Sequence, residues 1–142
     1  MITFYSEGVD NPIQGEKDYV SWIEKAIMEE NYNCGDIAVI FCSDEYLLNI
    51  NQEYLNHNYY TDIITFDYSN ESIKSGDLFI SLDRVSDNAK QFGVSFDKEL
   101  ARVIIHGVLH LMGYKDSNED EKNNMRGLEN KYLKLLSRVE EL

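Results

Sequence analysis

Residues Phe96–Asp116 read FDKELARVIIHGVLHLMGYKD, and this stretch decides how the chain folds. Its apolar residues cover much of the circumference of a helix, which predicts a central helix from Phe96 to about Met112. Ser95 is expected to cap the start of this helix, and Gly113 can take the left-handed conformation that ends one. The other elements are therefore expected to pack around it.

The rest of the chain predicts a single α+β domain over residues 1–142, with helices packed on a mixed sheet of about four strands. Strands are expected at Ile2–Ser6, Asp36–Cys42, Asp62–Tyr68 and Asp77–Leu82, the last two spaced for a hairpin. Further helices are expected at Glu16–Asn31, Ser43–Leu55, Asp83–Gln91 and Ser117–Leu136. Ser43 and Ser117 are the expected N-caps, and the last helix has an apolar stripe of Met125, Leu128, Tyr132 and Leu135.

The composition limits the partners that the chain can have. A net charge of −13 argues against broad nonspecific binding of nucleic acids, and we expect no DNA partner. It leaves room for a locally basic groove or for a metal ion as the main positive charge of a site. Cys34 and Cys42 match no zinc spacing or disulfide framework, which favours a reducing, cytoplasmic location. We see no secretion signal and no apolar run of about 18 residues, so no membrane association is expected.

The histidines of the central helix indicate a metal site. His106 and His110 are one helical turn apart and project from the same face. If Gly113 lets the chain fold back, Asp116 arrives as a third ligand, and a fourth position stays open for water. The spacing matches that of the metzincin pattern H-E-x-x-H-x-x-G-x-x-H, with Asp116 at the last histidine. The sequence therefore predicts a metal-dependent hydrolase with one zinc ion, although two histidines and a carboxylate also suit iron(II).

One departure from the peptidase pattern concerns the reaction class. Zinc peptidases have a glutamate after the first histidine, which deprotonates the attacking water. This chain has Gly107 there. A glycine inside a helix costs about 1 kcal/mol relative to alanine, which suggests a close packing contact or room for a substrate. A zinc peptidase is therefore only a minor alternative.

The histidine block, two other segments and two single residues resemble the YbeY-type endoribonucleases, a family also called ribosomal RNA maturation factors. The matching parts are HGVLHLMGYKD, INQEYLNHNYYTDIITFDY (Ile50–Tyr68), GDLFIS (Gly76–Ser81), Met125 and Glu129. The resemblance implies a zinc-dependent, single-strand-specific endoribonuclease that matures the 3′ end of 16S ribosomal RNA, with the small ribosomal subunit as its partner and a role in ribosome quality control. His106 and His110 carry over as ligands, and the family's third histidine falls on Asp116.

Two further departures from the family affect RNA binding. The family typically has an arginine after the tyrosine and a proline before the threonine–aspartate pair. In this chain these two positions are Leu55 and Tyr60. If that arginine binds phosphate, the role must be absent or taken by another residue. Arg102, one turn before His106, is a candidate for contacting the scissile phosphate, and Arg84 and Lys98 are further candidates; each can equally be an ordinary surface charge.

Several roles stay open at this point. Asp62 can position the water or act as a base, but it can equally cap a turn, so the general base is unassigned. Tyr59 and Tyr60 can stack on unpaired bases. The main alternative function is a ribosome assembly factor whose metal is mainly structural, and an inert helix with chance histidines is another.

Overall fold

The computed structural model describes residues 1–136. Its strands are β1 (Ile2–Ser6), β2 (Asn33–Cys42), β3 (Ile63–Asp67) and β4 (Ile73–Ser81). Its helices are α1 (Glu16–Glu29), α2 (Asp44–Leu55), α3 (Leu82–Phe92), α4 (Phe96–Leu111) and α5 (Glu119–Leu133). The α+β class is confirmed.

The strands form one mixed, four-stranded sheet in the order β1-β2-β4-β3. β1 is parallel to β2 and β2 to β4, whereas β3 pairs antiparallel with β4. The predicted hairpin is therefore present, and it forms one edge of the sheet. This edge matters for the site, because α4 packs against both β3 and β4.

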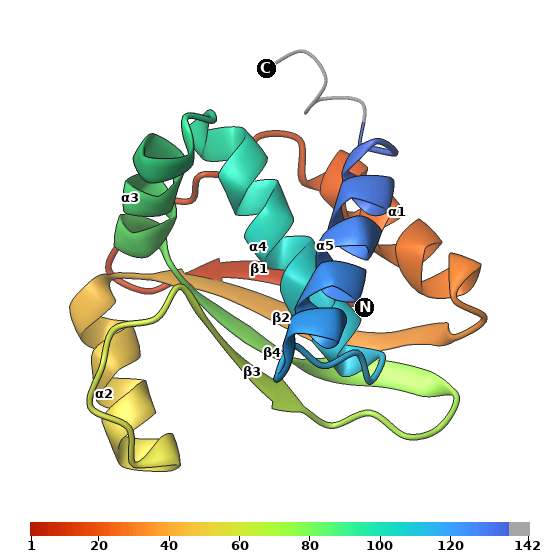
Figure 1. The fold of residues 1–142 in the computed structure, drawn as a ribbon, viewed down its shortest axis with the longest axis horizontal. Coiled ribbons are helices and arrows are strands. Elements are labelled where there is room, and N and C mark those ends of the chain that lie inside the picture. The colour runs from red at the N-terminus through yellow and green to blue at the C-terminus, as the bar shows by residue number, and fades with distance from the viewer. Residues whose placement is uncertain (137–142) are drawn as a thin grey trace.

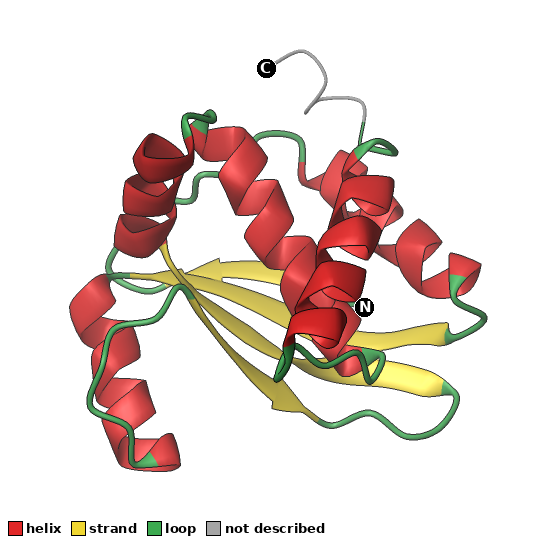
Figure 2. Cartoon of the chain, in the orientation of Figure 1, coloured by secondary structure: helices red, strands yellow, loops and turns green. Residues whose placement is uncertain are grey.

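The helices cover the two faces of the sheet unequally (Figures 1 and 2). α1, α3, α4 and α5 lie on one side, and α2 lies alone on the other. The large core lies under α4, whose Leu100, Ile104 and Leu109 are completely buried. A smaller cluster beneath α2 contains Leu47 and Ile64. The predicted central helix is confirmed.

Gly107 brings α4 close to the sheet. A Cβ added at this position would lie 2.7 Å from Cδ1 of Ile63 and 3.0 Å from Cδ2 of Leu78. Of the two readings that the sequence left open, the structure supports close packing. The same contact leaves no space at this position for the glutamate of a zinc peptidase.

Side-chain caps mark the starts of α2, α4 and α5. Ser43 accepts a hydrogen bond from the backbone N–H of Tyr46, and Ser95 from that of Lys98, as predicted. The prediction for α5 was wrong by one residue, because Asn118 is the cap and its Oδ1 accepts from N–H of Glu121. The backbone N–H of Ser117 instead donates a hydrogen bond to the Glu121 carboxylate, at 3.0 Å.

Several element ends also differ from the prediction. β2 begins at Asn33 rather than Asp36, and β4 at Ile73 rather than Asp77, because these polar ends pair with each other across a register shift. α5 ends at Leu133, so Leu135 lies beyond it and is 46% exposed instead of completing the apolar stripe.

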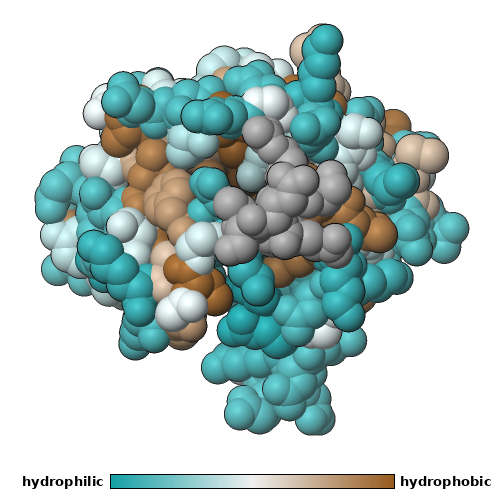
Figure 3. Space-filling model, turned by 90° about the horizontal axis from the view of Figure 1, so that it is seen from above, coloured by the Kyte–Doolittle hydropathy of each residue, from teal (hydrophilic) through white to brown (hydrophobic). Residues whose placement is uncertain are grey.

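Seen from above, the surface is mainly hydrophilic with several apolar patches (Figure 3). Within residues 1–136, no helix combines the length and apolarity needed to cross a membrane.

Candidate metal centre and active site

The chain folds back at the end of α4, between His110 and Asp116. Gly113 has a φ of 92°, and its N–H donates to the carbonyl of His110. The N–H of Tyr114 donates to the carbonyl of Leu109, which completes a Schellman motif. The following residues therefore turn back along α4, and Asp116 reaches the two histidines.

His106, His110 and Asp116 converge on a single point. The Nε2 atoms of the two histidines are 3.0 Å apart. Oδ2 of Asp116 lies 3.3 Å from Nε2 of His106 and 3.5 Å from Nε2 of His110. Ligands at roughly 2.0–2.1 Å from a tetrahedral zinc ion are about 3.3 Å from one another. The three atoms therefore have the spacing of three corners of such a tetrahedron.

The other nitrogen of each histidine shows why a cation suits this point. Nδ1 of His106 lies 2.7 Å from the Glu129 carboxylate, and Nδ1 of His110 lies 2.9 Å from the carbonyl of Tyr114. Both acceptors require a proton on Nδ1, so both Nε2 atoms turn lone pairs toward each other and toward a carboxylate. A positive ion relieves this repulsion, and the group can hold a metal ion.

Two charged side chains in series, Glu129 and Arg102, support His106 at its Nδ1 atom. Glu129 accepts a hydrogen bond from Arg102 at 2.8 Å, and Arg102 also donates to Asn130. Burial alone would raise the pKa of Glu129, but the hydrogen bonds from His106 and Arg102 lower it overall. Burial acts to lower the pKa of His106, yet the hydrogen bond and charge of Glu129 raise it overall. Glu129 is thus held as a carboxylate against the imidazole.

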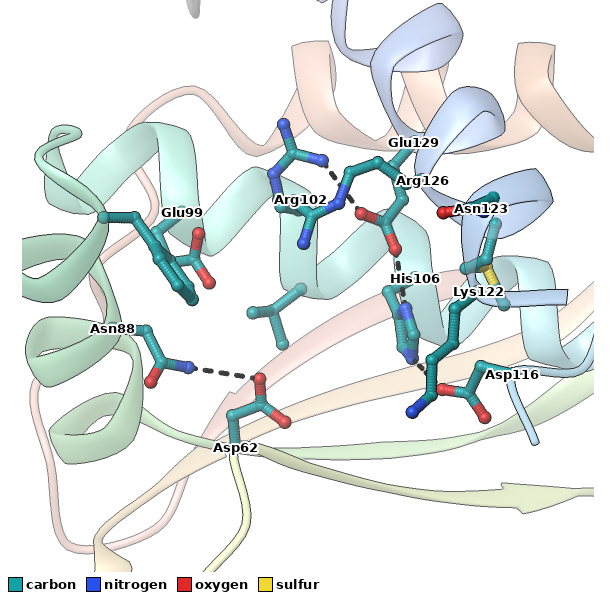
Figure 4. A pocket seen from close by; sticks show the side chains of 13 residues that line it. Asp62, Asn88, Glu99, Arg102, His106, Asp116, Lys122, Asn123, Arg126 and Glu129 are labelled. Atoms are coloured by element: carbon teal, nitrogen blue, oxygen red, sulfur yellow. Dashed lines mark hydrogen bonds and ion pairs between the residues drawn. The ribbon is translucent and has the colours of Figure 1, made fainter. Parts of the chain in front are cut away.

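Two hollows meet at this centre. The first runs between α3, α4 and α5 and is drawn in Figure 4. The second lies between the end of α2, the following loop and β3, and its lining includes Leu55, His57 and Tyr59. His106, Asp116 and Asp62 line both hollows. The centre therefore lies where the two hollows join.

Asp62 lies beside the centre, immediately before β3. Its carboxylate accepts a hydrogen bond from Asn88 of α3 at 3.3 Å, and its backbone carbonyl accepts from Ser81. Burial raises the pKa of Asp62, although the charge of His106 opposes this. Figure 4 shows its side chain turned into the first hollow, opposite His106.

The three basic candidates have different positions. Arg102 lines the first hollow but is engaged by Glu129 and Asn130. Arg84 lines neither hollow and is paired with Asp44 and Asp87. Lys98, in the first turn of α4, lines neither hollow either.

The structure also shows what surrounds Leu55 and Tyr60, the two positions that differ from the family pattern. Leu55 ends α2 and is 41% exposed on the wall of the second hollow. The hydroxyl of Tyr60 donates to Glu45, and its ring centroid lies 5.6 Å from the Arg84 guanidinium. Tyr60 therefore lies in a polar cluster away from the centre, whereas Tyr59 lines the second hollow.

Sequence reasoning missed the basic residues of α5. Lys122 and Arg126 line the first hollow, on the same side of α5 as Glu129. Their spacing of four and three residues places all three on one helical face, which could have been read from the sequence. The sequence also gave no role to Glu129, because its partner His106 is distant along the chain.

Comparisons with known proteins show which family the sequence matches. The sequence model of the family described as endoribonuclease YbeY matches residues 6–137. The chain is 50% identical over 137 residues to endoribonuclease YbeY of Phocaeicola vulgatus, covering 96% of this chain and 99% of that one. It is 51% identical over 134 residues to endoribonuclease YbeY of Christiangramia forsetii, covering 94% and 93%. The solution structure of TM1509 from Thermotoga maritima is similar, with a TM-score of 0.64, 29% identity and coverage of 94% and 87%.

Proposed function

This chain belongs to the endoribonuclease YbeY family and is an endoribonuclease; from that premise we propose that it cleaves single-stranded ribosomal RNA at a zinc centre. Its proposed place is the maturation of the 3′ end of 16S ribosomal RNA and ribosome quality control, on the small ribosomal subunit in the cytoplasm. The observation that carries the proposal is the convergence of His106, His110 and Asp116 at the junction of two hollows.

In this proposal the three ligands hold one divalent ion, which when bound polarises a phosphate oxygen and makes water more acidic. Glu129 and the carbonyl of Tyr114 fix the orientation of the imidazoles through Nδ1. Asp62 would orient the attacking water and accept its proton as the new P–O bond forms, and that proton would pass to the ribose oxygen whose bond to phosphorus breaks. Zinc is our first choice of metal and iron(II) the second.

The scissile phosphate is proposed to enter from the side of α5. Lys122 and Arg126 line the hollow there, and neither forms an ion pair within residues 1–136. They can take the role of the arginine that Leu55 replaces. Arg102 acts on the phosphate more weakly, since Glu129 already neutralises it. Arg84 and Lys98, which line neither hollow, receive no role in phosphate binding in this proposal.

The test is single-turnover cleavage of a single-stranded fragment from the 3′ end of 16S ribosomal RNA. Zinc-loaded wild type is compared with His110→Ala, and with His57→Ala as a control imidazole outside the centre. We expect His110→Ala to lose cleavage and His57→Ala to keep the metal. Equal product from wild type and His110→Ala would remove the proposed mechanism. Metal analysis of the purified protein distinguishes zinc from iron(II).

A second candidate is a ribosome assembly factor whose metal is mainly structural. Leu55 in place of the family arginine and the net charge of −13 favour this candidate, because both weaken RNA binding. Chelation separates the two. Selective loss of cleavage supports the nuclease, whereas unfolding together with loss of binding to small ribosomal subunits supports the assembly factor.

A further inference from the structure

Glu99 is a buried acid that the proposed mechanism does not use. Glu99 is only 4% exposed, yet its side chain forms part of the wall of the first hollow. No hydrogen bond or ion pair of its carboxylate is found among residues 1–136, and Arg102 and Arg126 attract it only at longer range. A buried carboxylate without a hydrogen-bond donor is costly, so this position suits a ligand that brings donors.

The position of Glu99 relates it to the metal centre. Glu99, Val103 and His106 are spaced by four and three residues, which puts them on one face of α4. Seven residues of helix place Glu99 about 10 Å along the axis from His106. Figure 4 shows the carboxylate turned into the hollow, across from Asp62 and far from the ligands. The hollow therefore extends from the reacting centre to this acid.

The chemistry of this end of the hollow selects one part of a nucleotide. The carboxylate of Glu99 repels phosphate, so this end disfavours the backbone of RNA. Phe92, which is 56% exposed, offers an aromatic face on the same wall, and the side chain of Val103 is buried beneath. The whole hollow, whose lining also includes His106 and Asp116, measures about 400 Å³, so one base occupies only part of it. An aromatic face, an apolar wall and acceptors favour an unpaired base with N–H donors on its edge.

We propose that this end of the hollow, formed by Glu99, Asn88, Phe92 and Val103, binds a guanine base of the substrate next to the cleaved phosphate. The carboxylate of Glu99 accepts from N1–H and from the exocyclic amino group of guanine, two parallel donors that match its two oxygens. Adenine and cytosine offer one amino group, and uracil places carbonyl oxygens beside its single N–H. The inference rests on the proposed function, since it requires single-stranded RNA at the centre.

The test uses five-nucleotide uridine oligomers with guanosine, inosine, adenosine or uridine at the central position. Inosine differs from guanosine only in lacking the amino group, so it removes one of the two donors. We expect wild type to cleave beside guanosine about five- to a hundredfold faster than beside uridine, with inosine in between. In Glu99→Gln the guanosine-to-inosine ratio should fall to near one. Asp97→Asn, an exposed acid-to-amide change in the same helix, should keep the wild-type ratio.

A binding measurement separates this inference from the proposed function. Fluorescence anisotropy of the labelled oligomers, with a chelator present, reports the preference without cleavage. Cleavage of all four oligomers at equal rates would overturn the guanine pocket and leave the nuclease standing, as would a preference that persists in Glu99→Gln. Tighter binding of guanosine that depends on Glu99, without any cleavage, would support the pocket and overturn the proposed function.

Discussion

The Glu129 carboxylate lies 2.7 Å from Nδ1 of His106, and this contact joins α5 to the metal centre on α4. The contact fixes which nitrogen of His106 is protonated and therefore which one faces the ion. α5 thus supports the candidate metal site although it supplies none of the three candidate ligands.

Replacing Glu129 tests this support. We expect Glu129→Gln to lower the affinity for zinc by about 10- to 100-fold, because the amide no longer holds the Nδ1 proton with a charge. A competition titration against a chromogenic chelator measures the change. Asn130→Ala is the control, since Asn130 contacts Arg102 rather than the histidine. Equal affinities of wild type and Glu129→Gln would show that Glu129 only packs α5 onto α4.

The third ligand should set the acid limit of activity. Asp116→His raises the net charge of the metal centre by one, so we expect the acidic limb of the pH–rate profile to move to lower pH. Lys115→His adds an imidazole beside the ligand position and serves as the control. If the limb of Asp116→His coincides with that of wild type, the charge of the third ligand does not govern the reaction.

Two helical glycines should respond in opposite directions to alanine. Around Gly127, on α5, there is open space, so Gly127→Ala should stabilise the chain by about 0.5–1 kcal/mol. At Gly107 the new methyl group meets Ile63 and Leu78, and we expect a net loss of about 1 kcal/mol, since crowding outweighs the gain in helix propensity. Denaturant unfolding measures both. A stabilised Gly107→Ala would mean that α4 can move away from the sheet at no cost.

Glu99 should reduce stability at neutral pH. Burial raises the pKa of Glu99 above its ordinary value of 4.5, so the folded chain holds this proton more tightly than the unfolded chain does. The wild type therefore loses stability as the pH rises from about 4.5 through the folded pKa. Glu99→Gln lacks this loss and should unfold at higher denaturant concentration at pH 7 but not at pH 4. A variant less stable than wild type at pH 7 would indicate a structural acid.

The sequence predicted the elements better than their contacts. The caps at Ser43 and Ser95 and the apolar face of α4 are local signals, and each was read correctly. The starts of β2 and β4 were missed, because polar residues such as Asn33 are held there by backbone pairing that side-chain patterns do not encode.

The candidate site shows the same difference between local signals and contacts of distant residues. His106, His110 and Asp116 are close along the chain, and their spacing alone brought them together. The contact of Glu129 with His106 was missed, because it forms between two helices, and the burial of Glu99 was missed, because it lies in the charged first turns of α4. Arg84 was an equally reasonable candidate in the sequence, and only the fold shows that Asp44 and Asp87 engage it.

The turn at Gly113 means that all three candidate ligands come from a single short, continuous piece of chain, His106–Asp116. An ion bound there would link residues that are close in sequence and would not connect distant elements. It would therefore remove little conformational entropy from the unfolded chain. We therefore expect the sheet and its helices to survive demetallation, with only the tip of α4 and the returning loop loosening.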